Sequence, residues 1–505
     1  MEQGLRNNDN GPGSLFRSLY ENEMAQWTRP NSNFVFRTVS FEHQPLKLLH
    51  AIRRISWLTI FSSHQPPNPD PPKKSSNPIN SYPMEKTIIS LLPLLFFLIS
   101  LFLLVNGDLN VADFGAKGDG KTDASESFLK AWSAACASRA PTIIVVPRKR
   151  YLLGPVVFQG PCENSAITIR MDDAILVAPN YQKMGTLDSW LMFTGVQGVS
   201  IVGGYVDGQG SSLWACKTSG KNCPYGASSL AFYGSKDVVI NGLTSLNSKL
   251  YHIVIHSSNN VTLQGVTIHA PEESPNTDGI HVQSSTDVRI FSTGIKTGDD
   301  CISIGPGTRN LLIQRVACGP GHGISIGSLG KDSQEEGIQN ITVKTVVFTG
   351  TQNGLRIKSW ARPNYGFVKG VLFEQAVMQK VSNPIIIDQN YCPSNENCPN
   401  KSSGIQISQV TYKNIKGTSA TAVGMKFDCS ASYPCRGILL QDIQLTYQDQ
   451  FAESYCKNVK GSKFFANCDL AENLVMCLYL SQGGGSSTLI SSNLMIINYS
   501  LCLGF

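Results

Sequence analysis

Three motifs decide the fold of this chain: SPNTDGIHVQSS (residues 274–285), GDDCISIGPG (residues 298–307) and CGPGHGISIGSLG (residues 318–330). Each contains a short strand pattern in which two apolar residues flank another residue (IHV, ISI and ISI), and successive patterns are 22 residues apart. A repeat of about 20 to 25 residues that carries short strands indicates a solenoid, in which each turn lies on the next. The three motifs therefore predict neighbouring turns of one solenoid.

A titratable side chain stands two residues before each pattern: Asp278, Asp300 and His322. Parallel strands lie about 4.8 Å apart and equivalent positions form a column, so we expect Asp278 and His322 about 10 Å apart. Asp299 adds a third carboxylate to this column. One aspartate in a Gly-rich turn ordinarily serves the turn itself. The whole set in one column instead favours a functional site.

The alternation of apolar and other residues continues on both sides of the motifs. A period of two places one face of each strand in the solenoid interior. We therefore predict an all-β chain that forms a right-handed parallel β-helix of roughly ten turns. The patterns form two series, one at Val199, Val238, Val261, Val288, Leu311, Ile341, Val371, Val410 and Ile438, and one at Ile253, Ile280, Ile302, Ile324, Leu355, Ile385 and Met425.

A short helix is predicted at residues 125–136, ahead of the repeats. Asp123 is expected to cap its first turn. The helix should cover the open end of the solenoid, because an exposed strand edge is prone to pair with other chains. Its apolar face is expected to consist of Phe128, Leu129, Trp132 and Ala135.

The two ends of the chain differ from its middle. Residues 1–83 end in a Pro-rich tract that cannot build a core, so we interpret them as disordered or as an extension added by the gene model. Residues 84–107 begin at Met84 and continue in an apolar run, which is typical of a secretory signal peptide. The run is also long enough for a membrane anchor. Residues 108–470 are expected to form the β-helix, and residues 471–505 an atypical tail.

The composition is typical of a secreted all-β protein. Only 15% of the 505 residues are charged, and the formal net charge of +6 is weak evidence for a polyanionic partner. No run of Lys and Arg with interleaved aromatic residues indicates nucleic-acid binding, and no Cys/His spacing indicates zinc. Glycosylation sequons stand at Asn260, Asn340, Asn400 and Asn498.

The cysteines support an oxidising compartment. All 14 follow residue 135, and an even number in a secreted chain predicts disulfides. Three pairs are close enough in sequence to close small loops: Cys216 with Cys223, Cys392 with Cys398, and Cys429 with Cys435.

Four motifs together carry a family resemblance. NTDG (residues 276–279), GDDC (298–301), GHG (321–323) and RIK (356–358) resemble, in order, the signature motifs of the polygalacturonases, glycoside hydrolase family 28, and the chain looks like a plant member. The resemblance runs from about residue 110 to about residue 468. It implies a disulfide between Cys301 and Cys318. It also implies a secreted cell-wall enzyme that acts on pectin or polygalacturonate, with neither metal nor cofactor.

The resemblance also implies a role for each site residue. Hydrolysis of a glycosidic bond needs one acid and one base, and clustered carboxylates should raise at least one pKa. By resemblance, Asp299 is the proton donor, while Asp278 and Asp300 position and activate water, with inversion as the outcome. His322 tunes the donor. The substrate-binding residues are Arg356 and Lys358, which hold a galacturonate carboxylate, Asn276 on the cleft floor, and Tyr391 against a sugar ring.

Two other functions fit a β-helix. A polysaccharide lyase could bind calcium through clustered aspartates, but HG and RIK in this register resemble the hydrolases. A wall-binding protein without activity should lack one of the three aspartates, and none is lacking. We expect a monomer, with cell-wall inhibitor proteins as possible partners, and the sequence does not distinguish endo from exo action.

Overall fold

The computed structural model describes residues 108–478, apart from residues 185–186, 394–395, 462, 465–466 and 472–473. The described residues belong to one compact unit, Val105–Phe505. The predictions for residues 1–83 and 84–107, and for the tail beyond residue 478, lie outside this part of the chain. Within it, no helix has both the length and the apolar character needed to cross a bilayer.

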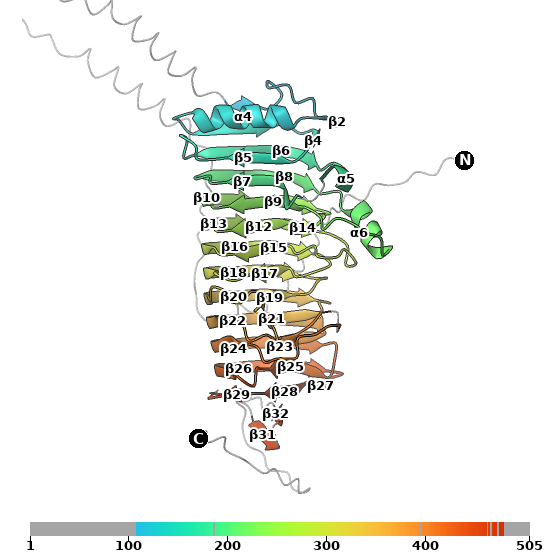
Figure 1. The fold of residues 1–505 in the computed structure, drawn as a ribbon, viewed down its shortest axis with the longest axis vertical. Coiled ribbons are helices and arrows are strands. Elements are labelled where there is room, and N and C mark those ends of the chain that lie inside the picture. The colour runs from blue at the N-terminus through green and yellow to red at the C-terminus, as the bar shows by residue number, and fades with distance from the viewer. Residues whose placement is uncertain are drawn as a thin grey trace, which may run out of the picture. The chain divides into compact units, whose positions relative to one another are not determined.

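A stack of parallel strands forms the body of this unit, as Figure 1 shows. One sheet, called sheet 2 here, has 13 strands in the described part of the chain. Its strands from β5 to β28 pair in parallel, each with the equivalent strand of the next turn. They are β5 (Val156–Gln159), β7 (Ser189–Thr194), β9 (Ser228–Tyr233), β12 (Ile253–His256), β15 (Ile280–Gln283), β17 (Ile302–Ile304), β19 (Ile324–Leu329), β21 (Asn353–Trp360), β23 (Asn383–Tyr391), β25 (Val423–Asp428) and β28 (Glu453–Lys457).

The second sheet, sheet 1, has 19 described strands. Apart from the antiparallel pair of β26 and β27, its pairings are parallel. Its strands are β1 (Leu109–Asn110), β2 (Asp119–Asp123), β3 (Thr142–Val146), β4 (Arg150–Leu152), β6 (Ile167–Val177), β8 (Val199–Asp207), β10 (Lys236–Asn241), β11 (Thr244–Leu246), β13 (Asn259–Gln264), β14 (Thr267–His269), β16 (Thr286–Lys296), β18 (Arg309–Cys318), β20 (Ile338–Thr349), β22 (Gly366–Val381), β24 (Ile405–Ser419), β26 (Cys435–Tyr447), β27 (Gln450–Phe451), β29 (Val459–Lys460) and β30 (Lys463–Phe464).

The chain thus forms a right-handed parallel β-helix, and the prediction of roughly ten turns is confirmed. The predicted register is confirmed as well, since Ile280 pairs with Ile302 and Ile302 with Ile324. These side chains are fully buried, because alternate residues of each strand point into the interior. Each turn therefore adds one layer of aliphatic side chains to a continuous core.

Helix α4 (Ser125–Ala137) covers the N-terminal end of the stack. Phe128, Trp132 and Ala135 are buried as predicted, but Leu129 is 38% exposed, and Ala131 takes its place on the buried face. The spacing of three and four residues from Phe128 to Ala131, Trp132 and Ala135 accounts for this correction. The N-cap residue is Ala124, so the predicted cap at Asp123 is also wrong; its carboxylate instead accepts hydrogen bonds from the backbone N and Oγ of Ser125.

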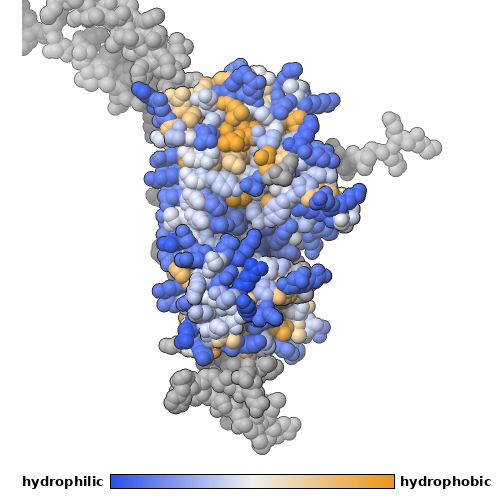
Figure 2. All heavy atoms as spheres, in the orientation of Figure 1, coloured by the Kyte–Doolittle hydropathy of each residue, from blue (hydrophilic) through white to orange (hydrophobic). Residues whose placement is uncertain are grey.

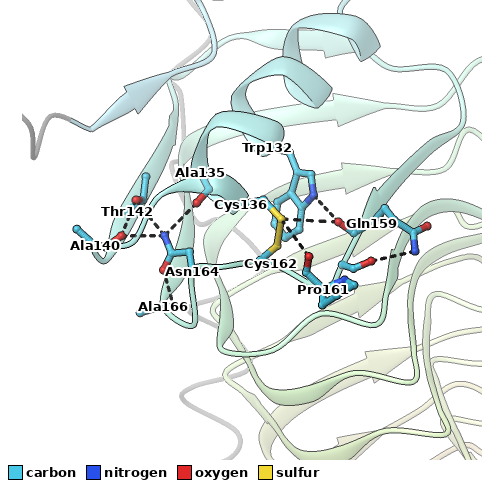
Figure 3. Close-up of a disulfide and its surroundings, with 11 residues drawn as sticks. Trp132, Ala135, Cys136, Ala140, Thr142, Gln159, Pro161, Cys162, Asn164 and Ala166 are labelled. Atoms are coloured by element: carbon cyan, nitrogen blue, oxygen red, sulfur yellow. Dashed lines mark hydrogen bonds between the residues drawn. A yellow bond between two sulfur atoms is a disulfide. The ribbon is translucent and has the colours of Figure 1, made fainter.

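A disulfide that the sequence analysis did not predict attaches the end of this helix to the first turn of sheet 2. Figure 3 shows Cys136 bonded to Cys162, with Trp132 Nε1 donating to the carbonyl of Gln159 at 3.1 Å. Asn164 Nδ2 donates to the carbonyl of Ala135 at 3.0 Å, at the helix end. The cap is therefore held by covalent, polar and apolar contacts together.

Four further disulfides match expectation: Cys216–Cys223, Cys301–Cys318, Cys392–Cys398 and Cys429–Cys435. Two short helices lie in turns that enter sheet 2, α5 (Tyr181–Met184) and α6 (Ser211–Thr218). At the C-terminal end, β31 (Asn467–Ala471) and β32 (Leu474–Leu478) pair antiparallel, across the domain boundary predicted at residue 470.

Two of the predicted glycosylation sites take part in a ladder of side chains outside sheet 1. Asn260 Nδ2 donates to Asp237 at 2.7 Å, and Asn340 Nδ2 donates to Asn310 at 2.7 Å. These residues adopt φ angles between 53° and 58°, a left-handed conformation that Asn and Asp tolerate well. The left-handed backbone conformation at these strand positions accounts for Asn there, whether or not a glycan is attached.

Candidate active site

The turns that enter β15, β17 and β19 hold three of the predicted catalytic residues, Asp278, Asp300 and His322. Hydrogen bonds between these turns keep them stacked: Gly279 N donates to Asp300 O at 2.9 Å, and His322 N donates to Asp299 O at 2.7 Å. Gly323 is required here, since its φ is +87° and a Cβ atom would lie 2.0 Å from the carbonyl of Asn353. The glycines of the motifs thus let neighbouring turns approach closely enough to form a site.

Asp300 is buried among cationic and hydroxyl donors. Arg356 Nη2 donates to Oδ1 at 2.7 Å, Lys358 Nζ to Oδ2 at 2.9 Å, and Ser325 Oγ to Oδ1 at 2.7 Å. Burial acts to raise the pKa of Asp300, but the charges of Lys358 and Arg356 outweigh burial and lower this pKa to about 2. Asp300 is therefore ionised over the whole range in which the protein is expected to work.

Arg356 and Lys358 themselves are almost fully buried, with 8% and 6% of their surfaces exposed. From the resemblance, this pair was expected to hold a galacturonate carboxylate of the substrate. The side chains do leave the interior, but both lie over Asp300 and neutralise it. A buried carboxylate attracts nearby cations strongly because the pair shares a medium of low dielectric constant.

Asp278, one turn earlier, has the opposite character. Its carboxyl is 7% exposed and receives a hydrogen bond from Ser303. Burial, followed by repulsion from Asp299 and Asp300, raises the pKa of Asp278 well above its usual value. Lys358 contributes only a small opposing effect on this pKa. Two aspartates in equivalent positions thus bind a proton with very different strength.

Asp299 is the most accessible of the three carboxylates. Its side chain is 19% exposed, and its Oδ1 atom lies 3.0 Å from Nδ1 of His322. Oδ1 also accepts a hydrogen bond from the backbone N of Asp300 at 2.8 Å, and Asn276 Nδ2 donates to Oδ2 at 3.4 Å. The predicted residues Asn276, Asp299 and His322 therefore do come together at the open side of the site.

Tyr391 lies at the far end of this group, as the last residue of β23. Its ring centroid is 5.1 Å from Nζ of Lys358 and 5.3 Å from the ring of Trp360, which contacts it edge-on. Tyr391 is thus held beside the predicted carboxylate-binding pair. Its aromatic neighbour Trp360 was not singled out from the sequence.

Further residues of the site were missed because they stand in the middle of the strand patterns. Ser303 contacts Asp278, Ser325 contacts Asp300, and His281 Nδ1 lies 2.8 Å from Ser303 Oγ. The signal was present in the register, because His281, Ser303 and Ser325 stand at equivalent positions of successive strands and lead to Arg356. The outward column of sheet 2 runs, in order, through Val157, Met192, Ala231, Val254, His281, Ser303, Ser325, Arg356, Ile386, Lys426 and Tyr455.

The outward column changes from apolar to polar as it reaches the site. The surface changes in the same direction: in Figure 2 apolar residues gather over the N-terminal turns, and hydrophilic residues dominate from the middle turns onward. A polar floor bounded by apolar turns suits a ligand that is polar in one part and has apolar faces in another.

A metal ion fits these residues poorly. Asp299, Asp300 and His322 each offer an atom within 4.8 Å of the others. However, both oxygens of Asp300 already accept hydrogen bonds from cations, and His322 Nδ1 is directed at Asp299. Two positive side chains at the same carboxylate repel a further cation. The set is better suited to proton transfer than to metal binding.

Comparison with known proteins agrees with this geometry. The family model described as "Glycosyl hydrolases family 28" matches residues 136–468. A polygalacturonase of Prunus persica is 56% identical over 354 residues, which cover 70% of this chain and 90% of that protein. An exopolygalacturonase of Platanus acerifolia is 42% identical over 356 residues, covering 70% and 94%.

Solved structures show the same fold. An endo-xylogalacturonan hydrolase of Aspergillus tubingensis aligns with a TM-score of 0.62 at 20% identity, covering 70% of this chain and 98% of that one. A polygalacturonase of Erwinia carotovora aligns with a TM-score of 0.53 at 26% identity, covering 68% and 94%. The β-helix body is thus shared, and identity at this level extends the similarity no further than the fold.

Replacing Asp278 with Asn should stabilise the protein at neutral pH. The pKa of Asp278 is raised on folding, so the folded state binds a proton that the unfolded state releases above about pH 4, and stability falls as the pH rises toward the folded pKa. Asn does not titrate. The gain should therefore be absent near pH 3.5 and grow by about 1.4 kcal/mol for each pH unit between the two pKa values.

Calorimetric melting of Asp278→Asn and wild type near pH 3.5 and near pH 7 checks this expectation. The exposed Asp449→Asn variant is the control and should match wild type at both values. An Asp278→Asn variant that melts below wild type at neutral pH would show that Asp278 is not strained by its neighbours.

Proposed function

The chain belongs to glycosyl hydrolase family 28, and from this premise we propose that it hydrolyses the α-1,4 bonds between galacturonate residues of pectin. The observation that carries the proposal is the grouping of Asp278, Asp299 and Asp300 beside the cations Arg356 and Lys358. The carboxylates supply acid and base for glycoside hydrolysis, and the cations complement an acidic sugar.

Asp299 is the proton donor in this proposal. A donor must first reach the leaving oxygen, and its pKa matters only once that geometry is met. Asp299 is the carboxyl most open to the cleft, and it contacts His322, through which its proton could be replaced. Asp278 has the raised pKa, which makes it the competing candidate. Asp300, kept ionised by Lys358 and Arg356, suits the role of base toward water.

A substrate with an activated leaving group should separate the two candidates. On polygalacturonate, Asp299→Asn should lose about 10²- to 10⁴-fold in kcat, the usual contribution of general acid catalysis. On a galacturonate oligomer linked to nitrophenol, the departing phenolate needs no proton, so Asp299→Asn should recover most of its activity. Asp278→Asn should stay impaired on both substrates, because it acts on the water side.

The reverse pattern, with recovery in Asp278→Asn alone, would transfer the donor role to Asp278. Proton NMR of the first product formed by wild type completes the experiment. The β anomer is expected for the inverting reaction, and the α anomer would require a covalent intermediate instead.

Substrate charge is the second feature of the proposal. We propose that Arg356 and Lys358, which contact Asp300, also bind a galacturonate carboxylate of the substrate. Tyr391 is proposed to pack against a sugar ring. Esterification removes the substrate charge, so kcat/KM of wild type should fall as methyl esterification rises. Charge-assisted contacts contribute about 1.5–3 kcal/mol each, roughly ten- to a hundredfold in binding.

Lys358→Asn and Arg356→Gln should therefore raise KM on de-esterified pectin by about tenfold or more and lose most of the preference for it. Steady-state kinetics on pectins of graded esterification measure this. Because both cations also lower the pKa of Asp300, the acid limb of the pH profile should move upward in the same variants. Equal kcat/KM of wild type on de-esterified and fully esterified polymer would contradict the assignment.

We further propose that the protein is exported to the cell wall by residues 84–107, acts as a monomer, and meets wall inhibitor proteins there. The family match begins at residue 136, and the proposed catalytic and substrate-binding residues all lie between Asn276 and Tyr391. A chain that begins at Met84 should be secreted and active, as measured by polygalacturonase activity in the medium. Retention of that chain in the cell, with secretion of the full chain, would contradict the signal-peptide interpretation.

A further inference from the structure

One segment beside the active site contains none of the residues proposed to take part in hydrolysis. Residues 208–227 connect β8 to β9 and contain helix α6. They occupy the same edge of sheet 2 as the turns that carry Asp278, Asp300 and His322, because each of those turns also leads from a sheet 1 strand into a sheet 2 strand. Figure 1 shows α6 projecting beside the turns before β9 and β12.

The segment is rigidly attached to the β-helix. Leu213 and Trp214 are buried, and Cys216–Cys223 closes the loop after the helix. The buried Lys249 donates from Nζ to the carbonyl of Gly208 and to that of Pro179. Gly226, with φ +109°, packs so closely that a Cβ atom would lie 2.7 Å from the carbonyl of Lys249. These contacts fix the backbone of the segment, so its solvent-exposed side chains are held in place.

The segment presents an aromatic ring with an ammonium group beside it. Tyr225 is 63% exposed although the backbone around it is fixed. Lys217 Nζ donates to the carbonyl of Tyr225 at 2.8 Å and lies 5.5 Å from the centroid of its ring. Burial lowers the pKa of Lys217, and no carboxylate in the described part of the chain lies within salt-bridge distance of it. An anion at this place would therefore find a cation that lacks an acidic partner.

A row of side chains leads from this group to the catalytic carboxylates. Tyr225 neighbours Tyr251, whose pKa burial raises strongly, with Asp278 and then Tyr225 adding to the effect. The ring of Tyr251 in turn stacks on that of His281, with centroids 5.0 Å apart. His281 contacts Ser303, and Ser303 contacts Asp278. Tyr225 is therefore on the N-terminal side of Asp278, whereas Arg356 and Lys358 are on its C-terminal side.

We propose that Tyr225 and Lys217 form a binding subsite for a galacturonate residue of the polymer, on the side of Asp278 opposite Arg356 and Lys358. The apolar face of the sugar packs on the exposed ring, and its carboxylate pairs with the ammonium group. Aromatic rings bind apolar surface while tolerating polar edges, and a half-buried ammonium favours a carboxylate. The inference rests on the proposed function, since it assigns a second contact to the same substrate.

Kinetics on long and short substrates test this subsite. Tyr225→Ala and Lys217→Gln should each raise KM on polygalacturonate by about three- to tenfold or more, with kcat nearly unchanged, because they remove binding far from the reacting bond. On digalacturonate, whose two sugars both flank the bond that is cleaved, no sugar should reach Tyr225 and Lys217, so neither variant should differ from wild type. Tyr225→Phe keeps the ring and should stay close to wild type on both.

Methyl esterification of the polymer distinguishes the contribution of Lys217 to binding from that of Tyr225. On fully methyl-esterified polymer, Lys217→Gln should equal wild type, because no carboxylate remains to be paired, whereas Tyr225→Ala should still raise KM. The controls are Lys221→Gln, a second exposed lysine of the same segment, and Tyr205→Ala, an exposed tyrosine of β8. Both should match wild type throughout.

Unchanged KM in Tyr225→Ala and Lys217→Gln on the long polymer would overturn the subsite. An equal loss on short and long substrates would overturn it as well, because it would indicate damage to the catalytic group. If wild type itself fails to cleave polygalacturonate, the proposed function fails, and this outcome is distinct from an active wild type whose variants are unaltered. Melting temperatures equal to wild type exclude misfolding as the cause of any loss.

Discussion

Parallel pairing of each turn with the next, in unbroken register through the motif turns, is the constraint on which the site depends. From β12 to β19 every inward aliphatic residue pairs with its equivalent one turn later. A slip of one residue would place the apolar set outside and the polar set in the core. Length variation is therefore confined to the turns, and the turns before sheet 2 are where the catalytic residues and α6 are found. The rigid stack thus converts fixed offsets in sequence into fixed distances in space.

The buried group of Asp300, Arg356 and Lys358 shows how this register supports chemistry. Three charged side chains, one from the turn before β17 and two from β21, meet almost out of contact with water, at distances of 2.7 and 2.9 Å. Removing such groups from water is costly, and their mutual attraction offsets that cost only when all partners are in place. Two cations against one carboxylate leave net positive charge at the site. An acidic sugar would complete the balance, which is consistent with a site adapted to a polyanion.

The sequence predicted those features of the fold and the site that are determined by the spacing of the repeats. Spacing of 22 residues was sufficient to align Asp278, Asp300 and His322 on successive turns, and the observed hydrogen bonds agree. Cys136–Cys162 was not predicted, because these residues are 26 apart and belong to no motif. Leu129 was misplaced because its exposure depends on how α4 is rotated against the first turns, which helical periodicity fixes only approximately. The contact of Arg356 with Asp300 was also missed, since a strand pattern tells that a side chain points outward but not which neighbour it reaches.

Asp278 and Asp300 differ in pKa because they lie one turn apart in the stack. Each aspartate is followed, one turn later, by a serine of the outward column: Ser303 for Asp278 and Ser325 for Asp300. The local arrangement is therefore the same in both cases, and it cannot by itself account for opposite shifts in pKa. The difference lies one turn further, where the column continues to Ser325 for Asp278 but to Arg356 for Asp300.

Because neighbouring turns are about 4.8 Å apart, the cation that contacts Asp300 directly is one full turn more distant from Asp278. Asp278 consequently has burial and two negative neighbours without a cation in contact, and it holds a proton that Asp300 releases. Environments that drive the pKa values of paired carboxylates apart are what acid–base catalysis requires. In this fold the repeat itself supplies two equivalent aspartates, and the two cations of β21 that contact Asp300, Lys358 and Arg356, give them different protonation states.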